Sequence, residues 1–422
     1  MSKDSVIAGV DIGSSKICAL LGEVRPEGRV HVLGVGVAPS KGIRRGVVVN
    51  IEQAVESITG AVAKAERASG YKIVSAYVTV AGAHISSLSN RGVVAVAHPD
   101  RMIRPDDVQR AVEAASVISL PTDRQIVHVV PRSFVVDGQD GVHNPAGMVG
   151  YRLDVDAHVI TGGATAIQNM ARCLSRAGIA VAGLVFEPLA SAEAVLDEEE
   201  KEMGVALADI GGGTTNLVAY SEGSLCHASV TPLGGGHVTN DIAVGLRTPL
   251  GSAEELKLAF GHALPASVAE GEMVRIHSFG GNGNETSRRR LCKIVEARLE
   301  EVCTVIAAEI ARAGYDGMFP AGVVLTGGTA ETPGIEDLAR EVFRVPVRVG
   351  RPRGVTGLNE MARGPDYAAA VGLLLWAART EQGALPAAGL TGSVTRGQGE
   401  GQASRLAKAS ARLGTWLRSF LP

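Results

Sequence analysis

An internal repeat of a strand–turn–strand pattern constrains the fold of this chain more than any other feature. Val6–Leu20 and Val205–Ala219 share one plan: an apolar strand ends in Asp-Ile-Gly, small or hydroxyl residues follow, and a second apolar strand begins. Each copy runs on into another strand-like segment, at Arg29–Val37 and Ser224–Pro232. The repeat predicts two duplicated domains that each open as a β-meander, with their first turns facing each other.

The first turn of each meander carries the residue types that bind phosphate. Glycines let the backbone approach an anion closely, consecutive amide N–H groups form an anion-binding nest, and hydroxyl groups add donors. A carboxylate at the start of such a turn would repel phosphate, so Asp11 and Asp209 are predicted to hold Mg²⁺, directly or through water. Lys16 adds a positive charge to the first turn.

A third glycine turn, Leu325-Thr-Gly-Gly-Thr329, lies between a predicted strand and a helix that begins near Pro333. Such a turn allows a nucleoside to pass close to the backbone. A single Asp-x-Gly is often an ordinary turn, but three glycine turns in this order are hard to obtain by chance. Together they predict a nucleotide site.

Composition excludes several other classes of protein. The chain has 422 residues, 45% of them apolar, which is enough for two to four domains with buried cores. Its 41 basic and 44 acidic residues nearly cancel, which argues against a nucleic-acid-binding protein. The five cysteines show neither CxxC spacing nor metal-like spacing with histidine. We expect a reduced cytosolic setting, no signal peptide and no membrane-spanning segment.

The rest of the pattern predicts an α/β protein with an inserted unit. Asn50–Ser69 has apolar residues at helical spacing, with Asn50 as the N-cap. Within residues 83–160, strands are predicted at Gly92–Ala97, Gln125–Val136 and Arg152–Ile160, with a helix that opens at Pro105. Further helices are predicted at Ala166–Ala177, from Pro188, at Ser252–Phe260, at Arg288–Ala313 and at Tyr367–Thr380.

Three motifs together resemble the phosphate 1, phosphate 2 and adenosine motifs of the actin, Hsp70 and sugar-kinase superfamily. They are Asp11–Lys16, Asp209–Thr215 and Leu325–Thr329. Within that superfamily, the chain is similar to FtsA, a family of bacterial division actins, at Ser40–Asn50, in the insert, at Thr356–Leu358 and at Tyr367–Gly372. The resemblance implies an actin-like ATPase fold, with two duplicated α/β domains around a nucleotide cleft that holds ATP and Mg²⁺.

The resemblance also implies how the chain divides into domains. It implies that the usual actin subdomain 1B is absent and that a differently placed subdomain replaces it. The expected ranges are 1–82, 161–202 and 367–380 for the first actin-like domain, 83–160 for the insert, 203–235 and 316–366 for the second domain core, 236–315 for its upper subdomain, 381–403 for a flexible linker and 404–422 for an amphipathic helix.

Site residues are carried over by position in the three motifs. Asp11 and Asp209 would organise the metal and take part in any hydrolysis. The residues expected to hold the phosphates and line the adenosine are Gly13, Ser14, Ser15, Lys16, Gly211, Gly212, Gly213, Thr214, Thr215, Gly327, Gly328 and Thr329. Lys257 matches a position that often flanks the base, although a solvated helix lysine is an equally good interpretation.

Two positions bear on metal binding and hydrolysis. The second phosphate motif of the superfamily commonly ends in Asp, whereas this chain has Asn216, which removes one negative charge near the metal. Glu187 occupies the place where hydrolysing relatives position the attacking water, and a carboxylate there could act as a general base. Its alternative role is that of a helix N-terminal Glu stabilised by the helix dipole. The resemblance implies at most a slow Mg²⁺-dependent ATPase.

The last nineteen residues form an amphipathic pattern. At 100° per residue, the apolar positions Leu406, Ala409, Leu413, Trp416, Leu417, Phe420 and Leu421 fall within an arc of roughly 140°. The basic residues Arg405, Lys408, Arg412 and Arg418 lie outside that arc. Each basic residue adds up to about 1 kcal/mol near an anionic leaflet. We expect reversible binding to anionic membrane lipids, with docking on the protein's own surface as the alternative.

The resemblance therefore implies a peripheral, ATP-binding filament protein at the division site. It would polymerise with itself, tie the ring of the tubulin-like protein FtsZ to the cytoplasmic face of the membrane, and recruit later division proteins, with FtsZ contacting the region near residues 236–315. Polymerisation would turn weak anchors into firm attachment. A PilM-like scaffold of a pilus or secretion assembly is the nearest alternative. A chaperone would need a peptide-binding domain, and a small-molecule kinase would have no use for the basic tail.

Overall fold

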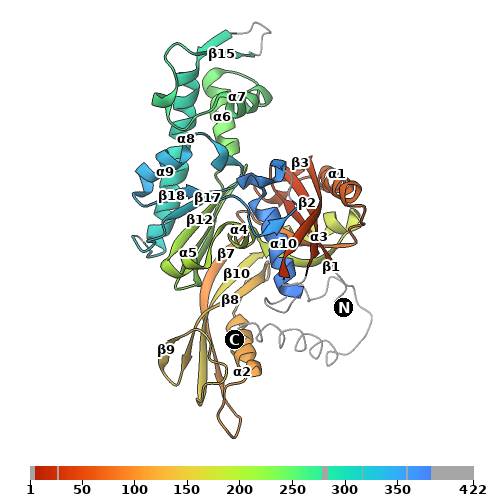
Figure 1. The fold of residues 1–422 in the computed structure, drawn as a ribbon, viewed down its shortest axis with the longest axis vertical. Coiled ribbons are helices and arrows are strands. Elements are labelled where there is room, and N and C mark those ends of the chain that lie inside the picture. Colours follow the sequence, from red (N-terminus) through yellow and green to blue (C-terminus); the bar gives the residue numbers. More distant parts are fainter. Residues whose placement is uncertain (1–4, 26–27, 278–283, 316, 358–359, 382–422) are drawn as a thin grey trace.

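The computed structural model describes residues 5–25, 28–277, 284–315, 317–357 and 360–381. Two large sheets form the centre of the molecule, and smaller units extend from it at both ends of its long axis (Figure 1). The predicted linker beyond Glu381 and the predicted amphipathic helix at 404–422 lie outside the described residues. No helix in the described part combines the length and the apolar composition needed to cross a bilayer.

The first large sheet contains the first copy of the repeat. Its strand order is β11-β6-β1-β2-β3-β19, and the first three strands along the chain form an antiparallel meander. β6 pairs in parallel with β1, and β11 with β6, while β19 extends the opposite edge beside β3. The bounds are Ser5–Ile12 for β1, Lys16–Val24 for β2, Val30–Pro39 for β3, Ser75–Val80 for β6, Ala180–Phe186 for β11 and Val355–Thr356 for β19.

The second large sheet repeats this topology. Its order is β14-β13-β12-β17-β18, with an antiparallel meander followed by two parallel strands. The bounds are Val205–Ile210 for β12, Thr215–Ser221 for β13, Ser224–Thr231 for β14, Val323–Thr326 for β17 and Val347–Val349 for β18. The shared strand order confirms the predicted duplication, because two unrelated α/β units would not repeat both the meander and the parallel extension.

Helices pack against both large sheets, and buried residues of helices and strands together form the cores. Asn50 caps α1 as predicted, since its side-chain oxygen accepts a hydrogen bond from the Gln53 backbone N–H at 3.0 Å. In the first domain the helices are α1 (Ile51–Ser69), α3 (Ala164–Arg176), α4 (Glu187–Val195) and α10 (Ala368–Glu381). Those of the second half are α5 (Glu198–Met203), α6 (Gly235–Leu246), α7 (Leu250–Phe260), α8 (Arg288–Arg312) and α9 (Ile335–Phe343).

The crossing of α10 and α4 depends on one glycine. A Cβ placed on Gly372 would lie 1.7 Å from the Ala190 carbonyl oxygen, so the two helices can approach only with glycine at this position. We expect Gly372→Ala to lower the free energy of unfolding by about 1–3 kcal/mol or more through overpacking. Gly251→Ala is the control, since a Cβ at that position of α7 meets nothing within 4 Å and should raise stability by about 0.5 kcal/mol. Thermal unfolding of both variants measures the contrast, and equal melting temperatures would contradict this packing.

The insert is a separate small unit at the lower end of Figure 1. Its four-stranded sheet has the order β7-β10-β8-β9, and one face packs on α2 to form a third hydrophobic core. The bounds are Ser86–Ala95 for β7, Pro105–Ser116 for α2, Arg124–Val136 for β8, Gln139–Val142 for β9 and Arg152–Gly163 for β10. The first strand was predicted at Gly92–Ala97, so the observed strand begins earlier and ends earlier.

The upper end of Figure 1 is formed by α6, α7 and part of α8, with the short hairpin of β15 (Met273–Ile276) and β16 (Asn284–Ser287) beyond them. α8 runs from this end back toward the second sheet. Buried residues on α8, among them Leu291, Leu299 and Ile306, belong to the same hydrophobic core as β12 and β17. The upper unit is therefore continuous with the second domain.

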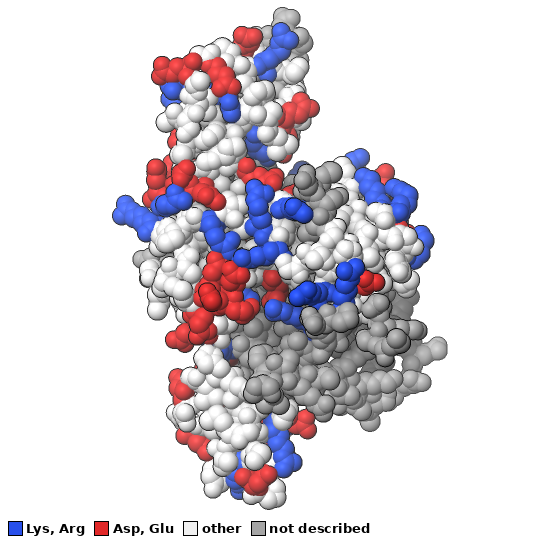
Figure 2. Space-filling model, viewed as in Figure 1, with Lys and Arg blue, Asp and Glu red and all other residues white. Residues whose placement is uncertain are grey.

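Charged side chains join α5 to the edge of the second sheet. Arg348 of β18 donates to both carboxylate oxygens of Glu200, at 2.8 and 2.7 Å, and Arg353 pairs with Asp197 at 2.8 Å. Figure 2 shows the result as an acidic patch over α5 with lysines and arginines beside it. Because these acidic side chains pair with arginines of the same protein, we assign this surface no binding partner.

Candidate functional site

The two repeated turns meet across the space between the domains. In each turn a glycine N–H donates to the carbonyl three residues later, from Gly13 to Lys16 at 3.1 Å and from Gly211 to Thr214 at 2.9 Å. A Cβ on Gly212 would lie 1.9 Å from Ser15 Oγ, in the opposite turn. The two turns therefore face each other in near contact, as the repeat predicts.

A cavity of about 430 Å³ lies between these turns and is bounded by both domains. Its lining includes nearly every site residue predicted from the sequence, namely Asp11, Gly13, Ser14, Ser15, Lys16, Glu187, Asp209, Gly211, Gly212, Gly213, Thr214, Lys257, Gly327, Gly328 and Thr329. Thr215 does not line it, because its hydroxyl is buried and donates to the Leu233 carbonyl at 2.9 Å. The structure thus brings three distant motifs to one cavity.

The two aspartates at the turns occupy equivalent positions. Asp11 is the residue before the last in β1, and its Oδ1 accepts from the Thr79 hydroxyl at 2.8 Å. Asp209 has the same place in β12, and its Oδ2 accepts from the Ser191 hydroxyl at 2.6 Å. Both are almost fully buried. One oxygen of each carboxylate is thus tied to the protein by a hydroxyl, which fixes the orientation of the group at the cavity wall.

Burial gives the carboxyl groups of the cavity an unusual affinity for protons. Removal from water raises the pKa of Asp209 to about 7 and raises the pKa of Asp11 above its ordinary value, despite the hydroxyl hydrogen bonds that oppose the change. Burial, with the nearby Asp209 charge, also raises the pKa of Glu187 well above its ordinary value. Several carboxylates held together in this way attract a cation, either a proton or a metal ion.

The neighbourhood of Glu187 suits a hydrated metal ion. Asn216 Nδ2 donates to Glu187 Oε2 at 3.0 Å, while Asn216 Oδ1 is buried with no hydrogen-bond partner in the described part of the chain. Among the described residues no group of three His, Cys, Asp or Glu side chains could hold a metal ion alone. Mg²⁺ needs few protein carboxylates, since it retains water and shares phosphate oxygens, so Asp11 and Asp209, which line the cavity, fit it.

The third glycine turn closes the cavity from the second domain. Gly327 has φ 84°, and a Cβ there would lie 2.4 Å from Asp209 Oδ1, so only glycine fits beside that carboxylate. Thr329 Oγ1 donates to the Gly211 carbonyl at 3.2 Å. The phosphate-type turn and the third turn are therefore joined directly.

Lys257 reaches the cavity from α7 and is not a solvated lysine. Its ammonium contacts Glu254 Oε2 at 2.7 Å, the Thr239 hydroxyl at 2.9 Å and the Gly235 carbonyl at 3.3 Å. These contacts place it at the start of α6, beside the third glycine turn. The structure thus favours the interpretation that Lys257 belongs to the cavity.

Comparison with known proteins identifies the group to which this architecture belongs. Residues 206–372 match the family described as cell division protein FtsA, and residues 82–161 match the SHS2 domain inserted in FtsA. The cell division protein FtsA of Pseudomonas aeruginosa is 45% identical over 372 residues, which cover 88% of this chain and 89% of that protein. The chain belongs to the FtsA family. The FtsA of Escherichia coli strain K12 is 34% identical over 426 residues, covering 98% of this chain and 97% of that protein.

Solved structures show the same fold at lower identity. A type IV pilus biogenesis complex of PilM and PilN matches with a TM-score of 0.65 and 17% identity, over 88% of this chain and 98% of that one. MreB5 of Spiroplasma citri bound to ADP matches with a TM-score of 0.51 and 12% identity, over 87% and 94%. These likenesses confirm the actin-like ATPase fold of this FtsA-family protein.

The raised pKa of Asp209 predicts how the stability of this FtsA-family protein depends on pH. Between the ordinary value of 3.8 and the folded value of about 7, the folded chain holds a proton that the unfolded chain has released. The free energy of unfolding should therefore fall as pH rises through this window. Thermal unfolding between about pH 5 and about pH 8 measures the slope. Asp209→Asn cannot titrate and should show a flatter profile; equal slopes for the two proteins would contradict the assignment.

Sequence reasoning missed several residues that line the cavity. They are chiefly Gly46, Glu254, Glu331 and Asp366. A Cβ on Gly46, at φ 75°, would lie 2.4 Å from the Ala81 carbonyl, so a glycine is required there. Glu254 could have been found from its position one helical turn before Lys257. Nothing in the local sequence singles out Asp366 or Glu331.

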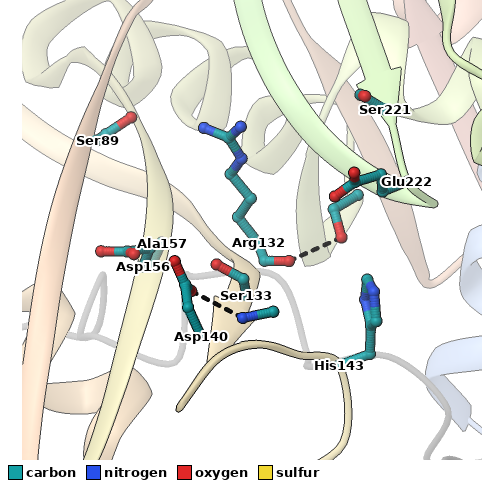
Figure 3. Close-up of a pocket in the computed structure, with 11 residues that line it drawn as sticks. Ser89, Arg132, Ser133, Asp140, His143, Asp156, Ala157, Ser221 and Glu222 are labelled. Carbon is teal, nitrogen blue, oxygen red and sulfur yellow. Dashed lines mark hydrogen bonds between the residues drawn. The ribbon is translucent and has the colours of Figure 1, made fainter. Parts of the chain in front are cut away.

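A larger cavity, of about 690 Å³, lies between the insert and the second domain. Figure 3 shows Arg132 of β8 and Asp140 of β9 around it, with Glu222 at the turn between β13 and β14. None of the three glycine turns contributes to its described lining. Across this joint, Ser224 Oγ of the second domain donates to the Arg132 carbonyl of the insert at 2.8 Å. We therefore place the functional site at the smaller cavity.

Proposed function

We propose that this FtsA-family protein binds ATP with Mg²⁺ in the cleft, polymerises, and tethers the FtsZ ring to the cytoplasmic face of the membrane at the division site. It does so as a peripheral protein, through the amphipathic segment 404–422, and it helps to recruit later division proteins. Bound nucleotide acts mainly as a clamp that sets the angle between the two domains. Contact with FtsZ lies on the upper unit near residues 236–315.

One observation carries the nucleotide part of the proposal. The glycine turns of two duplicated domains meet over a single cavity that also receives the third glycine turn. Backbone N–H groups from both sides can then bind one chain of phosphates, with Lys16 supplying positive charge. Gly327, Gly328 and Thr329 line the adenosine. The solved structure of Spiroplasma citri MreB5, which shares this fold, holds ADP, and this supports an adenine nucleotide.

Mg²⁺ supplies positive charge between the phosphates and the buried carboxylates. Asp11 and Asp209 would hold it directly or through water. Because burial raises the pKa of Glu187 well above its usual range, this carboxyl is a poor proton acceptor unless the metal lowers that pKa. The protein is accordingly at most a slow ATPase.

The tethering part of the proposal rests on family membership and on the tail sequence. The match to Escherichia coli FtsA covers 98% of this chain. Because so few residues lie outside the match, it must include most of the segment after Glu381. A basic amphipathic helix binds anionic lipid weakly, and a filament multiplies the anchors. The alternative of a pilus scaffold is not retained, because the relatives at 34–45% identity are division proteins and the PilM likeness is one of fold.

Two measurements on the full chain test the proposal. Titration calorimetry with ATP and excess Mg²⁺ should give saturable binding at a single site, and the absence of heat with ATP and ADP alike would overturn the nucleotide assignment. Sedimentation with anionic vesicles and purified FtsZ should bring FtsZ into the vesicle pellet only when this protein is present. FtsZ that remains in the supernatant would overturn the tether.

A further inference from the structure

Both ammonium groups that line the cavity already have carboxylate partners. Lys16 Nζ contacts Asp366 Oδ2, and Lys257 Nζ contacts Glu254 Oε2. Six carboxyl groups line the described cavity against these two ammonium groups. A phosphate that enters therefore meets a lysine whose charge is already compensated.

We propose that Asp366 sets the nucleotide affinity of this cleft by competing with the phosphates for the ammonium group of Lys16. The inference rests on the proposed function, since it needs a nucleotide in the cavity. It assigns a role to a residue outside the three glycine turns. The competing ligand has the chemistry of a polyphosphate, which is an oxyanion like the carboxylate that it displaces.

The surroundings of Lys16 hold its ammonium group toward Asp366. Lys16 Nζ lies 3.5 Å from the centroid of the Tyr367 ring, directly beside the carboxylate of the preceding residue. The side chains of Lys16 and Asp366 are 24% and 23% exposed, so water screens the pair less than it screens a surface ion pair. The cation–π contact and the ion pair together stabilise this position of the ammonium group.

Asp366 cannot easily withdraw from Lys16. It lies in the short 3₁₀ turn η5 (Pro365–Tyr367), which leads into α10 of the first domain. The carbonyl of Pro365 accepts from the Gly327 N–H and from the Thr326 hydroxyl, both at 3.1 Å, and both donors belong to the second domain. Because two hydrogen bonds hold the backbone next to Asp366, the competition is resolved by movement of the Lys16 side chain.

Two other roles for Asp366 make different predictions. If the carboxylate orients Lys16 for phosphate binding, its removal weakens nucleotide binding. If it acts only as one more negative charge, any neighbouring carboxylate has the same effect. Of the three roles, only competition for Lys16 predicts that nucleotide binds more tightly when Asp366 is replaced and not when a neighbouring carboxylate is replaced.

Titration of the full chain with ATP and Mg²⁺ distinguishes these roles. We expect Asp366→Asn, which keeps the shape of the side chain, to lower the dissociation constant about fivefold, the value of one partly exposed ion pair. Asp366→Ala serves as a second variant in case the amide finds a new partner. Damage to the fold lowers affinity, so tighter binding cannot come from a structural defect.

Glu331→Gln is the matched control. Glu331 lines the same cavity, and a Cβ on Gly364 would approach both carboxylates, at 2.3 Å from Asp366 Oδ1 and 2.8 Å from Glu331 Oε1, so the two groups are neighbours. The control removes one charge at this place and leaves the Lys16–Asp366 pair intact, and we expect a change below about twofold. Unchanged or weaker binding in both Asp366 variants, or equal tightening by Glu331→Gln, overturns the inference. If the unaltered protein binds no nucleotide, the proposed function itself fails.

Discussion

Replacing Leu413 and Trp416 together by glutamate is expected to abolish sedimentation of the full chain with anionic vesicles. In the proposed helix both residues lie inside the apolar arc, and burial of a large apolar side chain contributes about 1.5–3 kcal/mol. Losing two such side chains and adding two negative charges near an anionic surface should weaken binding at least about a hundredfold. Vesicle sedimentation at a fixed lipid concentration measures the loss.

A matched control separates burial of the apolar face from the change in charge. Ala411 and Thr415 lie on the opposite face of the same helix at 100° per residue, so Ala411→Glu with Thr415→Glu adds the same two charges and leaves the arc intact. This control should bind vesicles more weakly than the unaltered chain and far more strongly than the first variant. If both variants lose vesicle binding equally, charge alone attaches the segment to the membrane. If neither variant loses vesicle binding, the segment is not the membrane anchor, and that part of the proposal is wrong.

The parts of the fold that were predicted correctly are those with a local signal. Apolar strands on both sides of a glycine turn predict the hairpin around Asp11 and its copy around Asp209. Asn50 indicates the start of α1, because its side-chain oxygen accepts a hydrogen bond from a free N–H of the first turn. The cavity lining followed from these turns, since duplication of the domain brings them opposite each other.

The elements that were missed are governed by contacts between distant segments. α6 begins with Gly235 and Gly236, which are poor helix formers, because their N–H groups donate to the carbonyls of Gly211 and Gly212 at 2.9 and 2.7 Å. A side chain on the preceding Gly234 would lie 2.4 Å from the Gly211 carbonyl. Tertiary packing thus requires glycine where helix propensity opposes it.

Strand β7 was placed too late along the chain for a similar reason. Its first half contains Ser86, Ser87 and Ser89, which give no apolar alternation to recognise. Part of this polar surface packs against the second domain, where Ser87 Oγ donates to the Ala228 carbonyl at 2.6 Å. A strand that faces another domain through polar groups lacks the period of a half-buried strand, so the sequence pattern could not reveal it.

Gly212→Val is expected to weaken nucleotide binding at least about a hundredfold, because it forces apart the two turns on which the proposed site depends. The added Cβ would overlap Ser15 Oγ at 1.9 Å and crowd Ser15 Cβ at 3.1 Å. Displacing a binding group by about 1 Å is sufficient for an effect of this size. Calorimetric titration with ATP and Mg²⁺ measures the loss, and thermal unfolding checks that the variant is folded.

The same contact supplies a rescue experiment across the cleft. Ser15→Gly removes the two Ser15 atoms that crowd the new side chain most, Oγ and Cβ. Alone it should cost about tenfold or less in affinity through the loss of one hydroxyl donor. Combined with Gly212→Val, it should restore a large part of the binding, so the two changes together cost less than the sum of their separate free energies. Simple additivity would mean that the two turns do not touch in the nucleotide-bound protein. Recovery would show that residues from the two halves of the duplicated chain share one space, as the proposed nucleotide clamp requires.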